Sequence, residues 1–241
     1  MIRFKVLMCV AILIYAVGAR AESLYLERMA SARWSPAELA DTLTLLQQHE
    51  DIEPVSVQRP APFHQQKAPQ VDAQREFCVA CHTTLPHSEN KRLRSYLNLH
   101  VQSLACTSCH FRPEEVELSY RHWPLKQSVA ADDAPSLIAP FSAGVVEAFT
   151  REQPEIERLI GDWKQMDIQH KAAVHLHIHL PLDEQGPGCG NCHTREEPML
   201  DLQALEYDEE QIRKIQQDRV ARFLGDESLE DQPIRLIDLL R

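Results

Sequence analysis

The sequence predicts a mainly α-helical fold with extensive irregular loops and little β-structure, built around something other than a protein core. Fifteen prolines among 241 residues interrupt long regular elements. Aromatic residues make up only 6% of the chain, so its core lacks the usual large packing side chains. Apolar residues at helical spacing occur only in short, separate stretches. We therefore expect short helices and loops around a large prosthetic group.

The first two predicted helices flank a proline-rich stretch. Ser35-Pro36-Ala37-Glu38 reads as a capping box with proline at the first helical position, and this helix should stop before Pro54. Prolines between residues 54 and 69 indicate an extended linker. Residues 93, 97, 100 and 104 are Leu, Leu, His and Leu on one helical stripe, which predicts a helix running into Cys106.

The second half of the chain is less regular. Prolines should break any long element between residues 124 and 155. His175, His177 and His179 alternate with apolar residues, which predicts a short strand with all three imidazoles on one face. An amphipathic helix is expected over residues 208–224, with Gly225 as its stop and core packing as its role.

The N-terminus reads as a secretory signal. Arg3 and Lys5 precede fourteen apolar residues, and residues 19–21 (Ala-Arg-Ala) offer a cleavage site. Fourteen residues are fewer than the roughly twenty that span a bilayer, which favours a cleaved leader over a membrane anchor. We therefore expect a periplasmic or extracellular protein, with membrane association only through a partner or an uncleaved leader.

The net charge is acidic. Removal of residues 1–21 would delete three basic residues and no acidic one, so the charge would change from −11 to −14. Such a surface argues against nucleic-acid binding, because phosphates would be repelled. It suits a basic redox partner steered by charge, although solubility alone would also explain it.

Six cysteines outside the leader form three identical motifs. Residues 78–82, 106–110 and 189–193 each read C-x-x-C-H, the attachment signature of c-type haem. Two thiols at this spacing can form thioethers with one porphyrin edge, and the adjacent histidine supplies a proximal iron ligand. This assigns three covalent haem c groups to six cysteines and three proximal histidines: Cys78, Cys81, Cys106, Cys109, Cys189, Cys192, His82, His110 and His193.

Other uses of the cysteines explain less. A disulfide framework does not need a histidine after every pair. Zinc would take two CxxC pairs and leave the third unused. A thioredoxin-like redox site uses one pair at the start of a helix. Haem attachment accounts for every motif residue that carries chemistry.

These motifs resemble those of the periplasmic or extracellular multihaem cytochromes c of bacteria, and no subfamily is assigned. Compact class III cytochromes have similar motifs but are usually much shorter than this chain. The membrane-anchored quinol-oxidising tetrahaem family is less similar, because this chain has three motifs and a cleavable leader. The resemblance implies covalent haem, an architecture built around a haem cluster, and redox proteins as electron donor and acceptor.

Histidines outside the motifs are candidates for the sixth iron position. We expect histidine at both axial positions, since few methionines remain after the leader is removed. His100 is the strongest candidate because it lies on the apolar stripe before Cys106. His87 follows His82 too closely to serve the same haem and is expected to serve a neighbouring one. His179 is the third choice.

The remaining histidines are either reserve candidates for the sixth iron position or surface residues. The H-x-H-x-H stretch could bind a metal ion directly, or could offer one haem ligand and two spectators, His175 and His177. His122 and His64 are further reserve ligands, His64 from a proline-rich loop. His49 and His170 are expected to be surface residues.

The expected organisation follows the motifs. It comprises a signal peptide (1–21), an N-terminal helix and proline-rich linker (22–70), a dihaem module (71–125), a connecting segment (126–165), a third haem module (166–200) and a C-terminal helical segment (201–241). The expected function is electron relay rather than catalysis in a respiratory or extracellular redox chain. The alternatives are an enzyme or enzyme subunit with one open haem that reduces a small oxyanion or peroxide, and a haem-filament subunit. Of the three haems, the one at residues 189–193 would be the choice for an open site.

Overall fold

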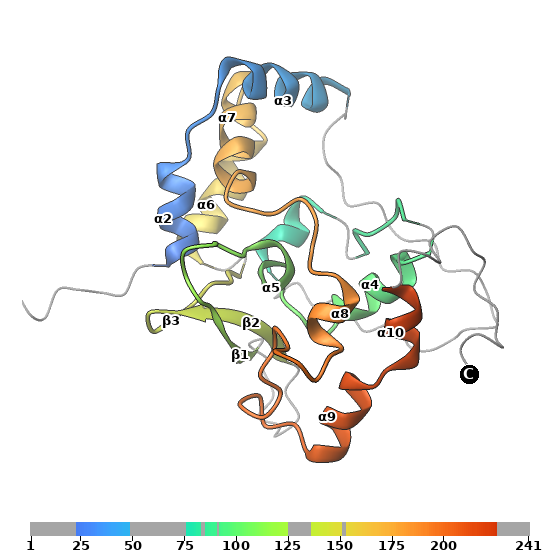
Figure 1. Ribbon diagram of the computed structural model, residues 1–241. Coiled ribbons are helices and arrows are strands. Elements are labelled where there is room, and N and C mark those ends of the chain that lie inside the picture. Colours follow the sequence, from blue (N-terminus) through green and yellow to red (C-terminus); the bar gives the residue numbers. More distant parts are fainter. Residues whose placement is uncertain are drawn as a thin grey trace, which may run out of the picture.

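A computed structural model describes residues 23–48, 76–82, 85–90, 92–124, 136–150 and 153–225. These residues form mostly helices and loops with one small three-stranded antiparallel sheet, so the predicted fold class is confirmed (Figure 1). The predicted leader and the proline-rich linker, with His49 and His64, lie outside the described residues. Within the described part, no helix is long and apolar enough to cross a membrane.

The helices are short. They are α2 (Leu24–Ser31), α3 (Pro36–Gln48), a 3-10 turn (Phe77–Ala80), α4 (Arg94–His100), α5 (Cys106–His110), α6 (Pro154–Trp163), α7 (Ile168–His179), α8 (Cys189–Cys192), α9 (Glu209–Gln216) and α10 (Arg219–Leu224). Figure 1 shows α5 in the middle of the molecule, with α2, α6 and α7 on one side and α8 to α10 on the other.

The N-terminal helices lie against α7. The predicted capping box at the start of α3 is present, because Ser35 N–H donates to the Glu38 carboxylate at 2.6 Å and Glu38 N–H donates to Ser35 Oγ at 3.2 Å. Helix α3 packs against α7, and so does α2 (Figure 1). Helix α2 is not among the helices predicted from the sequence. Buried Glu147 holds the start of α2, since its carboxylate accepts bonds from Ser23 Oγ at 2.6 Å and from the N–H groups of Leu24 and Tyr25 at 3.0 Å.

The sheet occupies a region where the sequence predicted broken elements. Strands β1 (Ser119–Pro124), β2 (Ser136–Ser142) and β3 (Val145–Val146) are antiparallel in the order β1-β2-β3. Pro140 lies inside β2, so the expectation that prolines break this region fails for a strand. Its carbonyl accepts the Glu147 N–H at 2.8 Å, just beyond the end of the short strand β3.

The largest apolar cluster joins the N-terminal helices to the haem motifs. Its buried members are Tyr25, Phe77, Phe111, Phe149 and Ile156. Phe77 immediately precedes Cys78, and Phe111 immediately follows His110. The buried aromatic residues of the described chain therefore lie in the cluster beside the first two motifs.

The predicted histidine strand is wrong, because residues 175–179 form the last turns of helix α7. The Asp167 side chain caps this helix by accepting the His170 N–H at 2.9 Å. Ala172 and Leu176, four residues apart, are buried on one face. Alternation of histidine and apolar residues matches the period of a strand, but the Asp167 cap and the buried face of Ala172 and Leu176 belong to a helix.

The predicted C-terminal helix is two helices. Helix α9 ends at Gln216 with Gln217 as its C-cap, and Asp218 caps α10 by accepting the Ala221 N–H at 2.8 Å. Gly225 ends α10 as predicted. A Cβ atom added there would lie 3.3 Å from Cys189 Cβ, so glycine permits the end of α10 to lie against the third motif.

Candidate functional site

Each C-x-x-C-H motif lies on a single helical turn. The first begins inside the 3-10 turn, with Cys81 as its cap. The second forms α5, and the third forms α8 with His193 as its cap. The His82 and His193 N–H groups each donate to the carbonyl of the first cysteine of their own motif at 2.9 Å. Residues three apart on a helical turn share a face, so the two thiols of each motif point the same way.

Four of the six motif cysteines have environments that favour a neutral sulfur. None of them is paired in a disulfide. Burial raises the pKa of Cys109 and of Cys192 to about 11, and burial also raises the pKa of Cys189. A hydrogen bond with Cys78, followed by burial, raises the pKa of Cys106. An uncharged sulfur is the state that a thioether keeps permanently.

Each proximal histidine faces a second histidine from elsewhere in the chain. The ring centroids of His82 and His179 are 5.9 Å apart with planes at 65°. Those of His110 and His87 are 6.3 Å apart and nearly parallel, at 14°. The centroids of His193 and His100 are 6.0 Å apart with planes at 89°.

These separations fit two imidazoles that bind one metal ion from opposite sides. A metal–nitrogen bond of about 2 Å on each side, plus about 1 Å from each nitrogen to its ring centre, gives a centroid distance of about 6 Å. The stacked pair His175 and His179, at 4.0 Å and 17°, leaves no such room. The residues present therefore fit haem iron at three positions.

Hydrogen bonds set the tautomer of five of the six paired rings. The Nδ1 atoms of His100, His110, His179 and His193 lie 2.7–2.8 Å from backbone carbonyls, which are those of Tyr96, Asp183, His175 and Ile215. His87 Nδ1 lies 3.3 Å from Asn98 Oδ1. A carbonyl oxygen only accepts, so Nδ1 carries the proton and Nε2 keeps the lone pair that a metal needs.

Burial keeps three of the paired rings neutral. It lowers the pKa of His179 to about 4, and it lowers the pKa of His82 and of His87 as well. Nearby histidines add to the effect, His175 at His179 and His110 at the other two. A metal ligand must be deprotonated, so these environments favour coordination.

The reserve histidines are differently engaged. His122 Nε2 lies 3.0 Å from the Leu205 carbonyl, so this atom acts as a donor. His177 Nδ1 lies 2.7 Å from the Met29 carbonyl, and its ring packs against Trp34 with centroids 4.7 Å apart. The helical conformation of α7 separates His177 from His175 and His179, so the three do not form the metal cluster considered from the sequence. His170 is exposed beside Asp167.

The three motifs are neighbours in space. The Sγ atoms of Cys78 and Cys106 and a carboxylate oxygen of Glu76 lie within 4.8 Å of one another. At the second cysteine of α5, Cys192 is close enough to Cys109 to act on the pKa of its thiol. A Cβ atom added at Gly186 would lie 3.4 Å from Cys109 Cβ, so the approach to the third motif packs on the second.

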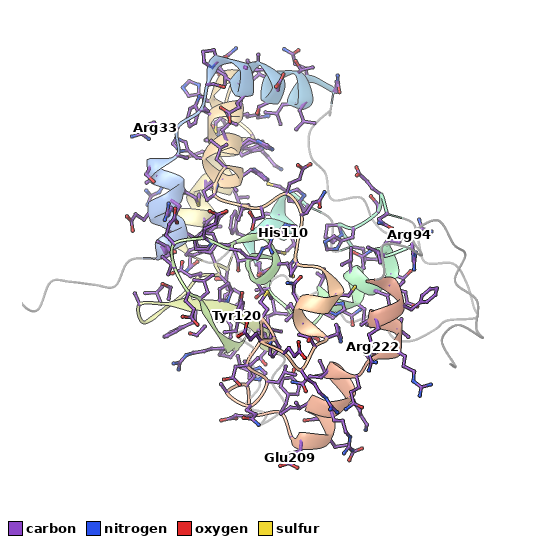
Figure 2. All side chains as sticks on the ribbon, viewed as in Figure 1. Arg33, Arg94, His110, Tyr120, Glu209 and Arg222 are labelled. Carbon is purple, nitrogen blue, oxygen red and sulfur yellow. The ribbon has the colours of Figure 1, made fainter. Side chains whose placement is uncertain are left out.

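The second motif occupies the centre of this arrangement. Figure 2 shows His110 in the middle of the molecule, with the labelled Arg222 and Arg94 toward one side. Two hydrogen bonds join His110 to Asp183: the Asp183 N–H donates to the His110 carbonyl at 2.7 Å, and His110 Nδ1 donates to the Asp183 carbonyl at 2.8 Å. The sequence alone leaves open whether the third motif lies beside the other two. The contacts of Cys109 with Gly186, and of His110 with Asp183, bring the segment that leads into the third motif against the second.

Comparison with known proteins gives one match. The model of the family described as Cytochrome c554 and c-prime matches residues 32–111, a third of the chain that includes the first two motifs, His87 and His100. No curated protein and no solved structure matches. The family implies covalently attached haem c and an electron-carrying role. Residues 32–111 are thus similar to the cytochrome c554 and c-prime family of multihaem c-type cytochromes.

Proposed function

We propose that this chain is an exported trihaem c-type cytochrome that relays electrons in a respiratory or extracellular redox chain. Three covalent haem c groups would be held at residues 78–82, 106–110 and 189–193. When bound, each haem supplies one iron that cycles between the ferric and ferrous states. The chain's residues hold these groups, fill their axial positions and set their surroundings.

The observation that carries the proposal is the set of three histidine pairs. His82 faces His179, His110 faces His87 and His193 faces His100, all at 5.9–6.3 Å. Two histidines at every iron would leave no position open to a substrate, which favours electron transfer over catalysis. Each second histidine comes from the same chain, which disfavours donation across a filament interface.

The spatial order of the motifs supports a relay. The second motif contacts the first through Cys78 and Cys106, and it contacts the third through Cys109 and its neighbours Gly186 and Cys192. Electrons would therefore pass between the outer sites through the central one. The pairing also crosses the modules, because His179 on α7 completes the first site and His100 completes the third.

Export and partner follow from the composition. The N-terminal leader favours export. Export suits covalent haem as well, because c-type haem attachment in bacteria takes place outside the cytoplasm. A net charge of −11 over the whole chain favours a basic redox protein as donor or acceptor, with no role for nucleic acid.

The test is a redox titration of protein matured in a haem-attaching host, followed by addition of carbon monoxide. We expect three one-electron reductions per chain and a reduced spectrum that carbon monoxide leaves unchanged. Binding of carbon monoxide together with turnover of nitrite or peroxide would instead support an enzyme with an open iron. Absence of covalent haem would overturn the proposal.

A further inference from the structure

A buried carboxylate lies where the first two haem sites meet. Glu76 is only 3% exposed, although most glutamates are on protein surfaces. Both of its carboxylate oxygens lie 2.8 Å from the Cys106 N–H, which donates to them. One of them also lies within 4.8 Å of the Sγ atoms of Cys78 and Cys106.

The backbone fixes this carboxylate rigidly. Glu76 pairs with Thr150 as an isolated antiparallel bridge, and the next N–H, that of Phe77, donates to the Phe149 carbonyl at 2.9 Å. The side chain then reaches from the first motif to the N–H of Cys106 in the second. Its position therefore depends on both motifs together.

From this geometry we infer that Glu76 is a positioning residue whose charge lowers the reduction potentials of the first and second haems. The inference rests on the proposed function. A ferric haem carries one more positive charge than a ferrous haem, so a fixed negative charge nearby stabilises the ferric form. Burial strengthens this effect, because electrostatic interactions are less screened away from water.

A metal-ion site is the competing interpretation. Glu76, Cys78 and Cys106 could together offer three ligand atoms to a cation. The two cysteines, however, belong to C-x-x-C-H motifs, and a sulfur in a thioether is no longer a thiolate ligand. The carboxylate is then left as a charge beside two thioether bonds.

Glu147 provides a matched control. It is fully buried like Glu76, but its carboxylate is engaged by Ser23 and by the N–H groups of Leu24 and Tyr25 at the start of α2. E147Q therefore removes the same charge from a buried glutamate that serves a helix end. E76D keeps the charge of Glu76 and changes only the length of the side chain.

The experiment is a redox titration of the three-haem wild type and of the variants E76Q, E76D and E147Q. The third haem is identified separately, by the change of its spectrum in the variant H100M. In E76Q the reduction equilibrium of two haems should shift toward the ferrous form by at least tenfold, which is 59 mV for one electron. The third haem in E76Q, and all three in E76D and E147Q, should stay close to wild type.

Two results would overturn the inference while leaving the proposed function intact. Unchanged potentials in an E76Q protein that holds three haems would show that the charge does not act on them. Glutamine can still accept the Cys106 N–H. Loss of haem from E76Q would therefore show that the charge of Glu76 is needed for haem attachment rather than for the reduction potentials. A wild-type protein without three haems would instead refute the proposed function itself.

Discussion

His87 and His110 face each other with nearly parallel rings, 6.3 Å between centroids and 14° between planes. His87 belongs to a loop five residues after the first motif, yet it stands opposite the proximal histidine of the second. Asn98 holds it there, since His87 N–H donates to Asn98 Oδ1 at 3.1 Å and Asn98 Nδ2 donates to the His87 carbonyl at 2.9 Å. A ligand near one haem motif in sequence is thus placed to serve the neighbouring haem.

Replacement of a paired histidine should open one iron. In H179A, we expect three haems per chain, with about one third of the haem becoming high-spin and binding carbon monoxide, because His82 loses its opposite ring. The control is H175A, since this residue stacks on His179 but offers it only a backbone carbonyl. A carbon monoxide response from H175A equal to that of H179A would contradict the pairing.

The two cysteines of the third motif should account for one of the three haems. The double variant C189A/C192A should retain two haems per chain, measured by the mass of the haem-bearing polypeptide, because each pair of thiols serves one group. A disulfide framework would instead leave the haem count unrelated to this pair. Three haems in the double variant would contradict the assignment.

Loss of the Glu147 carboxylate should weaken the fold. E147A removes the acceptor for three hydrogen bonds at the start of α2, one of them from buried Tyr25, so we expect the free energy of unfolding to fall by about 3 kcal/mol. Denaturant unfolding measures this change. The control E115A breaks only the exposed ion pair with Arg28 and should cost less than about 1 kcal/mol. Equal losses in both variants would argue against the cap.

Stability should fall in alkali through Tyr25. Burial raises the pKa of this side chain far above its ordinary value, and its hydroxyl donates to the Ile178 carbonyl at 2.9 Å. Unfolded tyrosine ionises near pH 10 while the folded residue stays protonated, so its contribution is full below that pH and is lost as the pH rises beyond it. Denaturant unfolding at pH 9 and 11 should show a smaller loss for Y25F than for wild type; an equal loss would exclude Tyr25 as a source.

The candidate residues of the site can be chosen from the sequence, but their arrangement cannot. The C-x-x-C-H motifs are recognisable by themselves. An apolar stripe, a sequence spacing and proximity to a motif make His100, His87 and His179 candidates for the second ligands. The partner of each ring could not be predicted, because pairing depends on tertiary contacts. His100 faces His193, from the third motif, although it directly precedes the second.

The fold was predictable where local signals agree. The capping box of α3 and the stop at Gly225 are encoded in a few adjacent residues. The histidine strand was wrong because the alternation covers only the last residues of a helix, whose Asp167 cap lies eight residues before His175. Glu76 was missed because a lone glutamate carries no motif, and its burial arises only when Thr150 and Cys106 come together.

The most direct test of the three-site account combines a pyridine haemochrome count with electron paramagnetic resonance of the oxidised protein. The account predicts three haems per chain, all low-spin ferric with two histidine ligands. Fewer than three haems, or a high-spin signal from any of them, would contradict it.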